Sequence, residues 1–166
     1  PKVTVINEDA GKWLETHQGF YDVIIADFPD PSNFGLGKLY AVPMYRLMKQ
    51  HLSETGILVV QSTSPYYAPR SFWCIEASLK AAGFFTYPYH AHVPSFGEWG
   101  YILAKKHDTY HIPTQYTLNM KFLDAEGTRL MFSFPPDMQR IKVEANHLNN
   151  QMLVHYFEQD WGNVIR

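Results

Sequence analysis

Two carboxylates directly follow an apolar run in the N-terminal part of the chain. Asp27 comes after residues 23–26, and Asp30 follows three positions later within Asp-Phe-Pro-Asp-Pro. Pro29 and Pro31 restrict the backbone on both sides of Asp30, which makes this a rigid acidic loop. A rigid acidic loop suits a cation. The alternative is that one of the aspartates only caps the next turn.

Polar side chains also follow two other apolar runs. Asp9 comes shortly after residues 3–6, and Gln61 comes directly after residues 57–60. In an open α/β sheet, ligands bind outside the carboxyl ends of the strands, so we expect Asp9, Asp27 and Gln61 to approach one crevice. Aromatic residues predicted on loops at the same edge could wall an alkyl or cationic substrate; they are Tyr66, Tyr67, Phe96 and Trp99.

The composition excludes several classes of protein. The 166 residues have a net charge of −2, which argues against a nucleic-acid-binding protein. The single cysteine, Cys74, excludes an internal disulfide and a multi-thiolate zinc site, and it favours a reducing compartment. His90 and His92 share a strand face, but no third ligand accompanies them, so we predict no metal site. No apolar run approaches the roughly 20 residues that span a bilayer.

The elements that must position these residues alternate along the chain. Strands are predicted at residues 3–6, 23–26 and 57–60, and the last two runs are apolar enough for burial on both faces. Helices are predicted at residues 10–17, at 43–52 with Gly56 just beyond the end, and from Pro69 to Gly83. Two further strands, at 84–93 and 101–104, are joined by a loop at 94–99. This order predicts an α/β fold whose sheet is mostly parallel, with an antiparallel last pair.

The character of the sequence changes near residue 107. Residues 1–106 are interpreted as the sheet domain, and residues 107–166 as a linker followed by a C-terminal helical appendage. Apolar residues recur there at spacings of three and four, which predicts an amphipathic helix beginning near residue 135 and packed on the sheet domain or on another subunit. They are Met138, Ile141, Ala145, Leu148 and Met152.

Four stretches together resemble the polyamine aminopropyltransferases, of which spermidine synthase is the best-known member. They are DVIIADFPDP at 22–31, residues 39–52, GILVVQ at 56–61 and VPSFGEWGYIL at 93–103. The tail, with FPPDM at 134–138, is similar to the long bacterial members, which often carry membrane-spanning helices ahead of the synthase domain. The resemblance implies a methyltransferase-like Rossmann fold. It also implies transfer of an aminopropyl group from decarboxylated S-adenosylmethionine, a co-substrate, to putrescine or a related diamine, giving spermidine in polyamine biosynthesis. No tightly bound cofactor and no metal are implied.

The same resemblance assigns roles to individual residues. Asp27 matches the catalytic acid–base aspartate, Asp30 the carboxylate that holds the diamine, and Gln61 the glutamine beside it. Asp9 and Ala10 match the acidic–small pair that reads the adenine. Phe96 falls where the family usually has a tyrosine in the substrate wall, so this chain lacks one hydroxyl there.

The family's glycine-rich turn and the acidic end of its second strand would lie ahead of Pro1, so the chain is interpreted as the C-terminal part of a longer protein. We expect such a part to be inactive alone and to dimerise through its open strand edge. We expect a cytoplasmic location. The resemblance to the long bacterial members implies a parent protein tethered at the cytoplasmic face of the inner membrane. Two alternatives remain: an S-adenosylmethionine-dependent methyltransferase-like domain, and a non-catalytic assembly module.

Overall fold

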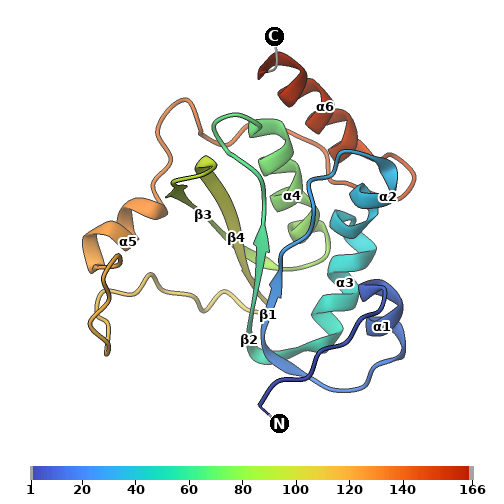
Figure 1. Ribbon diagram of the computed structural model, residues 1–166, viewed down its shortest axis with the longest axis horizontal. Helices are drawn as coiled ribbons and strands as arrows, with labels where there is room; N and C mark the ends of the chain where they lie inside the picture. Colours follow the sequence, from blue (N-terminus) through green and yellow to red (C-terminus); the bar gives the residue numbers. More distant parts are fainter. Residues whose placement is uncertain (1, 165–166) are drawn as a thin grey trace.

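The helices pack mainly against one face of a central sheet (Figure 1). The computed structural model describes residues 2–164, and residues 1, 165 and 166 lie outside the described part. The elements in chain order are α1 (Ala10–Thr16), β1 (Tyr21–Ala26), α2 (Phe34–Gly37), the 3-10 helix η1 (Lys38–Tyr40), α3 (Val42–His51), β2 (Leu52–Gln61), α4 (Pro69–Ala81), β3 (Phe85–Val93), β4 (Gly97–Lys105), α5 (Ala125–Met131) and α6 (Met152–Val164).

The sheet is mixed, with the strand order β1-β2-β4-β3. Only β1 and β2 pair in parallel, whereas β2–β4 and β3–β4 are antiparallel. The expectation of a mostly parallel sheet is therefore wrong for the described residues, while the antiparallel last pair is confirmed. The connection of that pair is also tighter than predicted, because the ladder continues to Val93 and Gly97 and Gly97 turns the chain with a φ of +77°.

The predicted first strand does not form. Residues 3–6 have no regular structure, and Val3 and Val5 are 75% and 87% exposed. A strand needs a partner for its backbone groups, and none of the described strands pairs with this segment. As a result β1 lies at the edge of the sheet.

Burial of β1 on both faces is a second prediction that the structure corrects. Ile24 and Ala26 face the core, but Val23 and Ile25 on the other face are 58% and 74% exposed. Successive side chains of a strand point to opposite faces, so only one face of β1 is covered by helices. In Figure 1, α3 and α4 lie along that covered side, whereas α5 stands off the opposite side.

Local sequence signals explain the two main helices. Pro43 and Pro69 lie in the first turns of α3 and α4, where a missing N–H costs nothing. Gly83 follows α4 with a φ of +88°, as predicted for its end. Gly56 does not close α3 but lies inside β2, which begins at Leu52 directly after the helix. Buried side chains of both helices form the core with the covered sheet face, including Tyr45, Met48, Phe72, Ile75, Leu79, Leu58, Val60 and Ile102.

The predicted helix through Ile141 and Ala145 is wrong, because residues 140–147 have no regular structure and the helix begins only at Met152. Asn146 is fully buried and explains the difference. Its amide nitrogen donates to the Gly37 carbonyl at 2.8 Å, and its amide oxygen accepts from the Leu153 backbone at 3.2 Å. These bonds join the irregular segment to α2 and to the first turn of α6.

The C-terminal appendage packs on the rest of the fold through α6, which lies against α4 (Figure 1). The division into residues 1–106 and 107–166 stays a prediction. None of the helices described within residues 2–164 is long and apolar enough to cross a membrane.

Candidate active site

A hollow of about 510 Å³ opens on the helix-free face of the sheet. Asp27 follows the last residue of β1, and Gln61 ends β2, the adjacent parallel strand. Phe96 reaches the same hollow from the turn between β3 and β4. The structure thus brings together four of the residues predicted to form the site, Asp27, Gln61, Phe96 and Trp99.

Aromatic side chains from the antiparallel strands wall this hollow. Tyr89 of β3 and Tyr101 of β4 stack with ring centroids 5.2 Å apart. Phe96 and Trp99 lie 5.2 Å apart on the same hollow, and Trp99 is 8% exposed. Burial raises the pKa of Tyr89 to about 12, and burial together with the Asp27 charge raises the pKa of Tyr101. The site therefore combines one carboxylate with neutral, electron-rich rings, an arrangement that suits an organic cation.

Tyr89 and Tyr101 were not among the predicted site residues. They oppose each other in the β3–β4 ladder, so finding them requires the register of that pair. Because side chains alternate between the two faces of a strand, spacing along each strand indicates which residues share a face with Tyr89 or with Tyr101, but it does not show that the two tyrosines face each other. Tyr66 and Tyr67, by contrast, were predicted at this edge but do not line the hollow; Tyr67 instead packs on Trp161 with centroids 6.2 Å apart.

Asp30 lies in the same loop as Asp27 but does not line the hollow. It is half-buried, and burial raises the pKa of its carboxyl. Burial raises the pKa of Tyr40, and the nearby charges of Asp30 and Asp27 raise it further. Asp27 and Asp30 therefore share one loop and one buried neighbour, while only Asp27 borders the aromatic hollow.

Asp9 and Ala10 lie apart from this hollow, at the start of α1. The Asp9 carboxylate caps that helix by accepting a hydrogen bond from the Lys12 backbone at 3.0 Å, and this bond is the main cause of the lowered pKa of Asp9. Asp9 also borders a second hollow of about 360 Å³, which has apolar walls that include Leu39 and Met44. Asp9 thus borders a different hollow from Asp27 and Gln61, and neither Ala10 nor Asp30 lines either of the two.

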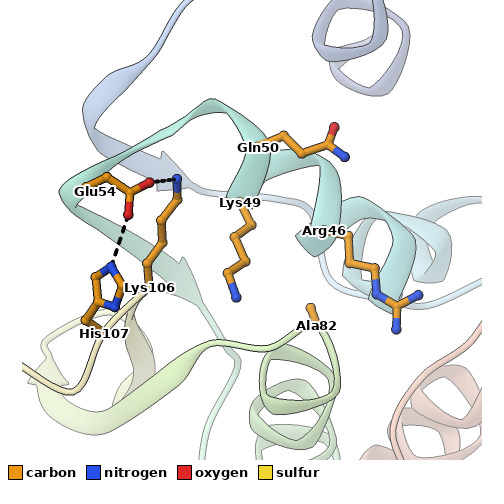
Figure 2. A pocket seen from close by; sticks show the side chains of 7 residues that line it. All are labelled: Arg46, Lys49, Gln50, Glu54, Ala82, Lys106 and His107. Atoms are coloured by element: carbon orange, nitrogen blue, oxygen red, sulfur yellow. Dashed lines mark hydrogen bonds and ion pairs between the residues drawn. The ribbon is translucent and has the colours of Figure 1, made fainter.

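A third, basic hollow of about 570 Å³ has a structural explanation (Figure 2). Lys49 donates to the Gly83 carbonyl and Arg46 to the Ala81 carbonyl, so both satisfy the C-terminal end of α4. Glu54 pairs with Lys106 at 2.8 Å and with His107 at 3.0 Å, as the dashed lines in Figure 2 show. Glu54 and Gln61 lie toward opposite ends of β2, so this hollow is remote from the aromatic one.

The remaining candidate groups also have structural partners. Cys74 is fully buried, and burial raises the pKa of its thiol to about 12, as expected for a packed small side chain. His90 contacts Glu98 through Nδ1 and the Ser133 carbonyl at 2.8 Å through Nε2. Within residues 2–164 we find no group of three or more histidine, cysteine or acidic side chains placed to hold a metal ion.

The sequence profile described as the spermine/spermidine synthase domain matches residues 1–116. Polyamine aminopropyltransferase 2 of Ralstonia nicotianae is 59% identical over 100% of this chain, which covers 33% of that protein. The polyamine aminopropyltransferase of Leptospira interrogans is 45% identical over 99% of the chain, which again covers 33% of the relative. The chain thus spans about a third of the length of these relatives, and the similarity to them extends through the C-terminal tail.

Solved structures show the same fold at lower sequence identity. The spermidine synthase from Thermotoga maritima matches with a TM-score of 0.67 and 19% identity, over 81% of this chain and 48% of that chain. A spermidine synthase in complex with the transition-state analogue AdoDATO matches with a TM-score of 0.69 and 21% identity, over 81% of this chain and 49% of that chain. The mixed α/β architecture described above is therefore that of the spermidine synthase fold.

Proposed function

This chain belongs to the spermine/spermidine synthase family, and on that premise we propose that it contributes the amine-binding part of a polyamine aminopropyltransferase. The reaction proposed is transfer of an aminopropyl group from decarboxylated S-adenosylmethionine to putrescine, which forms spermidine. One observation carries the proposal: the Asp27 carboxylate borders a hollow that is otherwise lined by Gln61, four aromatic side chains and four aliphatic ones, Val23, Ile25, Val59 and Val93.

The chemistry of the transfer matches these groups. The putrescine nitrogen attacks the methylene carbon next to the sulfonium, a new C–N bond forms, the C–S bond breaks, and the thioether nucleoside leaves. The nitrogen must lose a proton to act as the nucleophile, and Asp27 is the group that accepts it. A positioned general base contributes about 10²–10⁴-fold to such a step.

The second ammonium of the diamine needs a fixed anion that sets the direction of attack. Asp30 serves this purpose in our proposal, because it belongs to the same proline-restricted loop as Asp27. The aromatic pair Tyr89 and Tyr101 would contact the methylene chain between the two nitrogens. The acidic loop favours a cationic acceptor over the acceptors of methyltransferases.

Calorimetry with putrescine tests the amine-binding proposal directly. Asp27→Asn keeps the shape of the side chain and removes its charge, so we expect putrescine binding to weaken by about fivefold, in line with the roughly 1 kcal/mol that an ion pair at an exposed carboxylate contributes. Asp22→Asn is the control, since Asp22 lies on β1, ahead of the acidic loop, and accepts a hydrogen bond from the Ser53 hydroxyl at 2.8 Å outside the hollow. Equal affinity in the wild type and in both variants would refute the amine site.

We also propose that the chain self-associates through the edge strand β1. Along the free edge of β1, backbone groups have no strand partner among the described residues. Val23 and Ile25, which also line the hollow, add exposed apolar surface beside that edge. Light scattering should give the mass of a dimer or a larger assembly, and Ile25→Lys should lower it. A wild-type chain that remains monomeric at high concentration would exclude this association.

A further inference from the structure

One backbone carbonyl in the acidic loop accepts hydrogen bonds from two sides. The Phe28 carbonyl, directly after Asp27, lies 3.0 Å from the Tyr40 hydroxyl and 3.0 Å from the Gln61 amide nitrogen. The same Tyr40 hydroxyl is 3.1 Å from the carbonyl of Pro29. Two carbonyls between the catalytic and binding aspartates are therefore held by side chains from η1 and β2.

The orientation of the Gln61 amide follows from its two neighbours. The Phe28 carbonyl can only accept a hydrogen bond, and the indole Nε1 of Trp99 can only donate one. Both are satisfied only when the Gln61 nitrogen faces Phe28 and its oxygen faces Trp99, where the separation from the indole nitrogen is 2.7 Å. Both ends of the Gln61 amide are therefore engaged by the protein itself.

Tyr40 holds the loop from the buried side. Its side chain is 1% exposed, and its ring meets the Phe28 ring edge-on with centroids 5.6 Å apart. Burial, followed by the charges of Asp30 and Asp27, raises the Tyr40 pKa, so its hydroxyl remains a donor at all ordinary pH values. Phe28 is thus fixed by its ring and by its carbonyl together.

We propose that Trp99, Gln61 and Tyr40 are positioning residues, which fix the Phe28 carbonyl and through it the place of Asp27 relative to Asp30. This inference rests on the proposed function, and it changes the role of one residue within it. Gln61 acts through the loop, whereas the family resemblance implied a glutamine that serves the diamine. Trp99 then acts on the loop indirectly, because its indole N–H determines which end of the Gln61 amide faces the Phe28 carbonyl.

The chain itself allows a test that needs no activity. With ¹³C at the Phe28 carbonyl, Tyr40→Phe and Gln61→Leu should each move its resonance upfield, because each removes one donor, and the double variant should move it further. Trp99→Phe keeps a ring but removes the indole N–H, and it should move the resonance in the same direction. Tyr101→Phe is the control within the same hollow and should leave the resonance in place. A Phe28 signal unchanged by Gln61→Leu and Trp99→Phe, in variants whose other resonances show an intact fold, would overturn the proposal.

Transfer kinetics separate positioning from direct substrate contact. If Trp99 positions the loop, Trp99→Phe should lower kcat about tenfold to a hundredfold, with a KM for putrescine within about twofold of the wild type. A raised KM with unchanged kcat would place Gln61 and Trp99 in direct contact with the amine and refute the positioning role. A wild-type chain that transfers nothing agrees with the expectation that this part is inactive alone, and the carbonyl resonance then decides the inference. Absence of putrescine binding would instead count against the proposed function and leave the resonance test of the inference intact.

Discussion

Asp160 of α6 caps the N-terminus of α4 by accepting two hydrogen bonds from Ser71, one from its backbone nitrogen at 3.0 Å and one from its hydroxyl at 2.9 Å. The residue in the N-cap position, Ala68, has no side chain that can do this. A residue far along the chain therefore supplies the cap that the local sequence lacks.

Removing this cap should destabilise the fold. We expect Asp160→Ala to lower the free energy of unfolding by about 0.5–2 kcal/mol, the usual cost of losing an N-cap. Urea denaturation measures the change. Glu158→Ala removes an exposed carboxylate from the same helix and should have little effect. Equal losses in the two variants would mean that the bonds to Ser71 contribute nothing.

Two buried tyrosines should respond to the same substitution with opposite signs. Tyr45 is fully buried, and its hydroxyl has no hydrogen-bond partner in the described structure, so Tyr45→Phe removes an unsatisfied group and should stabilise the protein by about 1 kcal/mol. Tyr40→Phe removes a hydroxyl whose single hydrogen is shared between the Phe28 and Pro29 carbonyls, and it should cost about 0.5–1.5 kcal/mol. Thermal unfolding of the two variants checks this, and a loss of stability in Tyr45→Phe would contradict the first half.

The Asp30 carboxyl should make stability fall as the pH rises. Burial raises its pKa in the folded state above the ordinary value of 3.8, so the folded state holds this proton more firmly than the unfolded state. Ionisation of Asp30 therefore costs stability, with no cost below the unfolded pKa and the full cost above the folded pKa.

Asp30→Asn removes this cost and should raise the free energy of unfolding at neutral pH. The difference from the wild type should disappear below the ordinary value of 3.8. Urea denaturation across the acid range measures it, with the exposed Asp137→Asn as the control. A gain from Asp30→Asn that is the same at every pH would show that the charge is not its source.

Gly100 should tolerate no side chain. A Cβ atom there would lie 2.4 Å from Cε2 of Phe72 and 2.9 Å from the carbonyl oxygen of Thr63. Gly100→Ala should therefore cost about 1–3 kcal/mol. Gly162→Ala is the matched control, because its Cβ would meet nothing within 4 Å, and within α6 it should stabilise the helix by up to about 1 kcal/mol. Thermal unfolding that ranks the two variants in the reverse order would contradict the predicted clash.

Local patterns were enough to predict most of the elements. Pro69 and Gly83 mark the limits of α4 because each acts through its own backbone geometry. The apolar runs of β1 and β2 were likewise found, but the exposure of Val23 and Ile25 was not, since it depends on which helices cover each face. The sheet is mixed because β4 inserts between β2 and β3, and no local signal carries that order.

The C-terminal segment shows where a periodic pattern misleads. Met138 is buried, but Ile141 and Leu148 of the same pattern are 40% and 56% exposed, and residues 140–147 have no regular structure. Asn146 forms bonds with Gly37, which lies 109 positions away. This long-range contact favours an irregular backbone over the helix that the apolar spacing predicts, and only the three-dimensional structure reveals it.

Four residues of the hollow could be predicted from the sequence, namely Asp27, Gln61, Phe96 and Trp99. Asp27 and Gln61 could be predicted together because the carboxyl ends of adjacent parallel strands share an edge. Tyr89 and Tyr101 could not, because their place depends on the register of β3 and β4. The contact between Gln61 and Trp99 depends on the register of β2 and β4 and on the rotamers of both side chains.

The separation of 89 positions between Ser71 and Asp160 has a consequence for synthesis of the protein. At 5–20 residues per second, a ribosome adds Asp160 about 4–18 s after Ser71, so α4 leaves the exit tunnel before its cap exists. The nascent sheet domain must therefore wait for the C-terminal helix before α4 is secured. A nascent chain that stalls before Asp160 would present an uncapped α4 to chaperones and proteases.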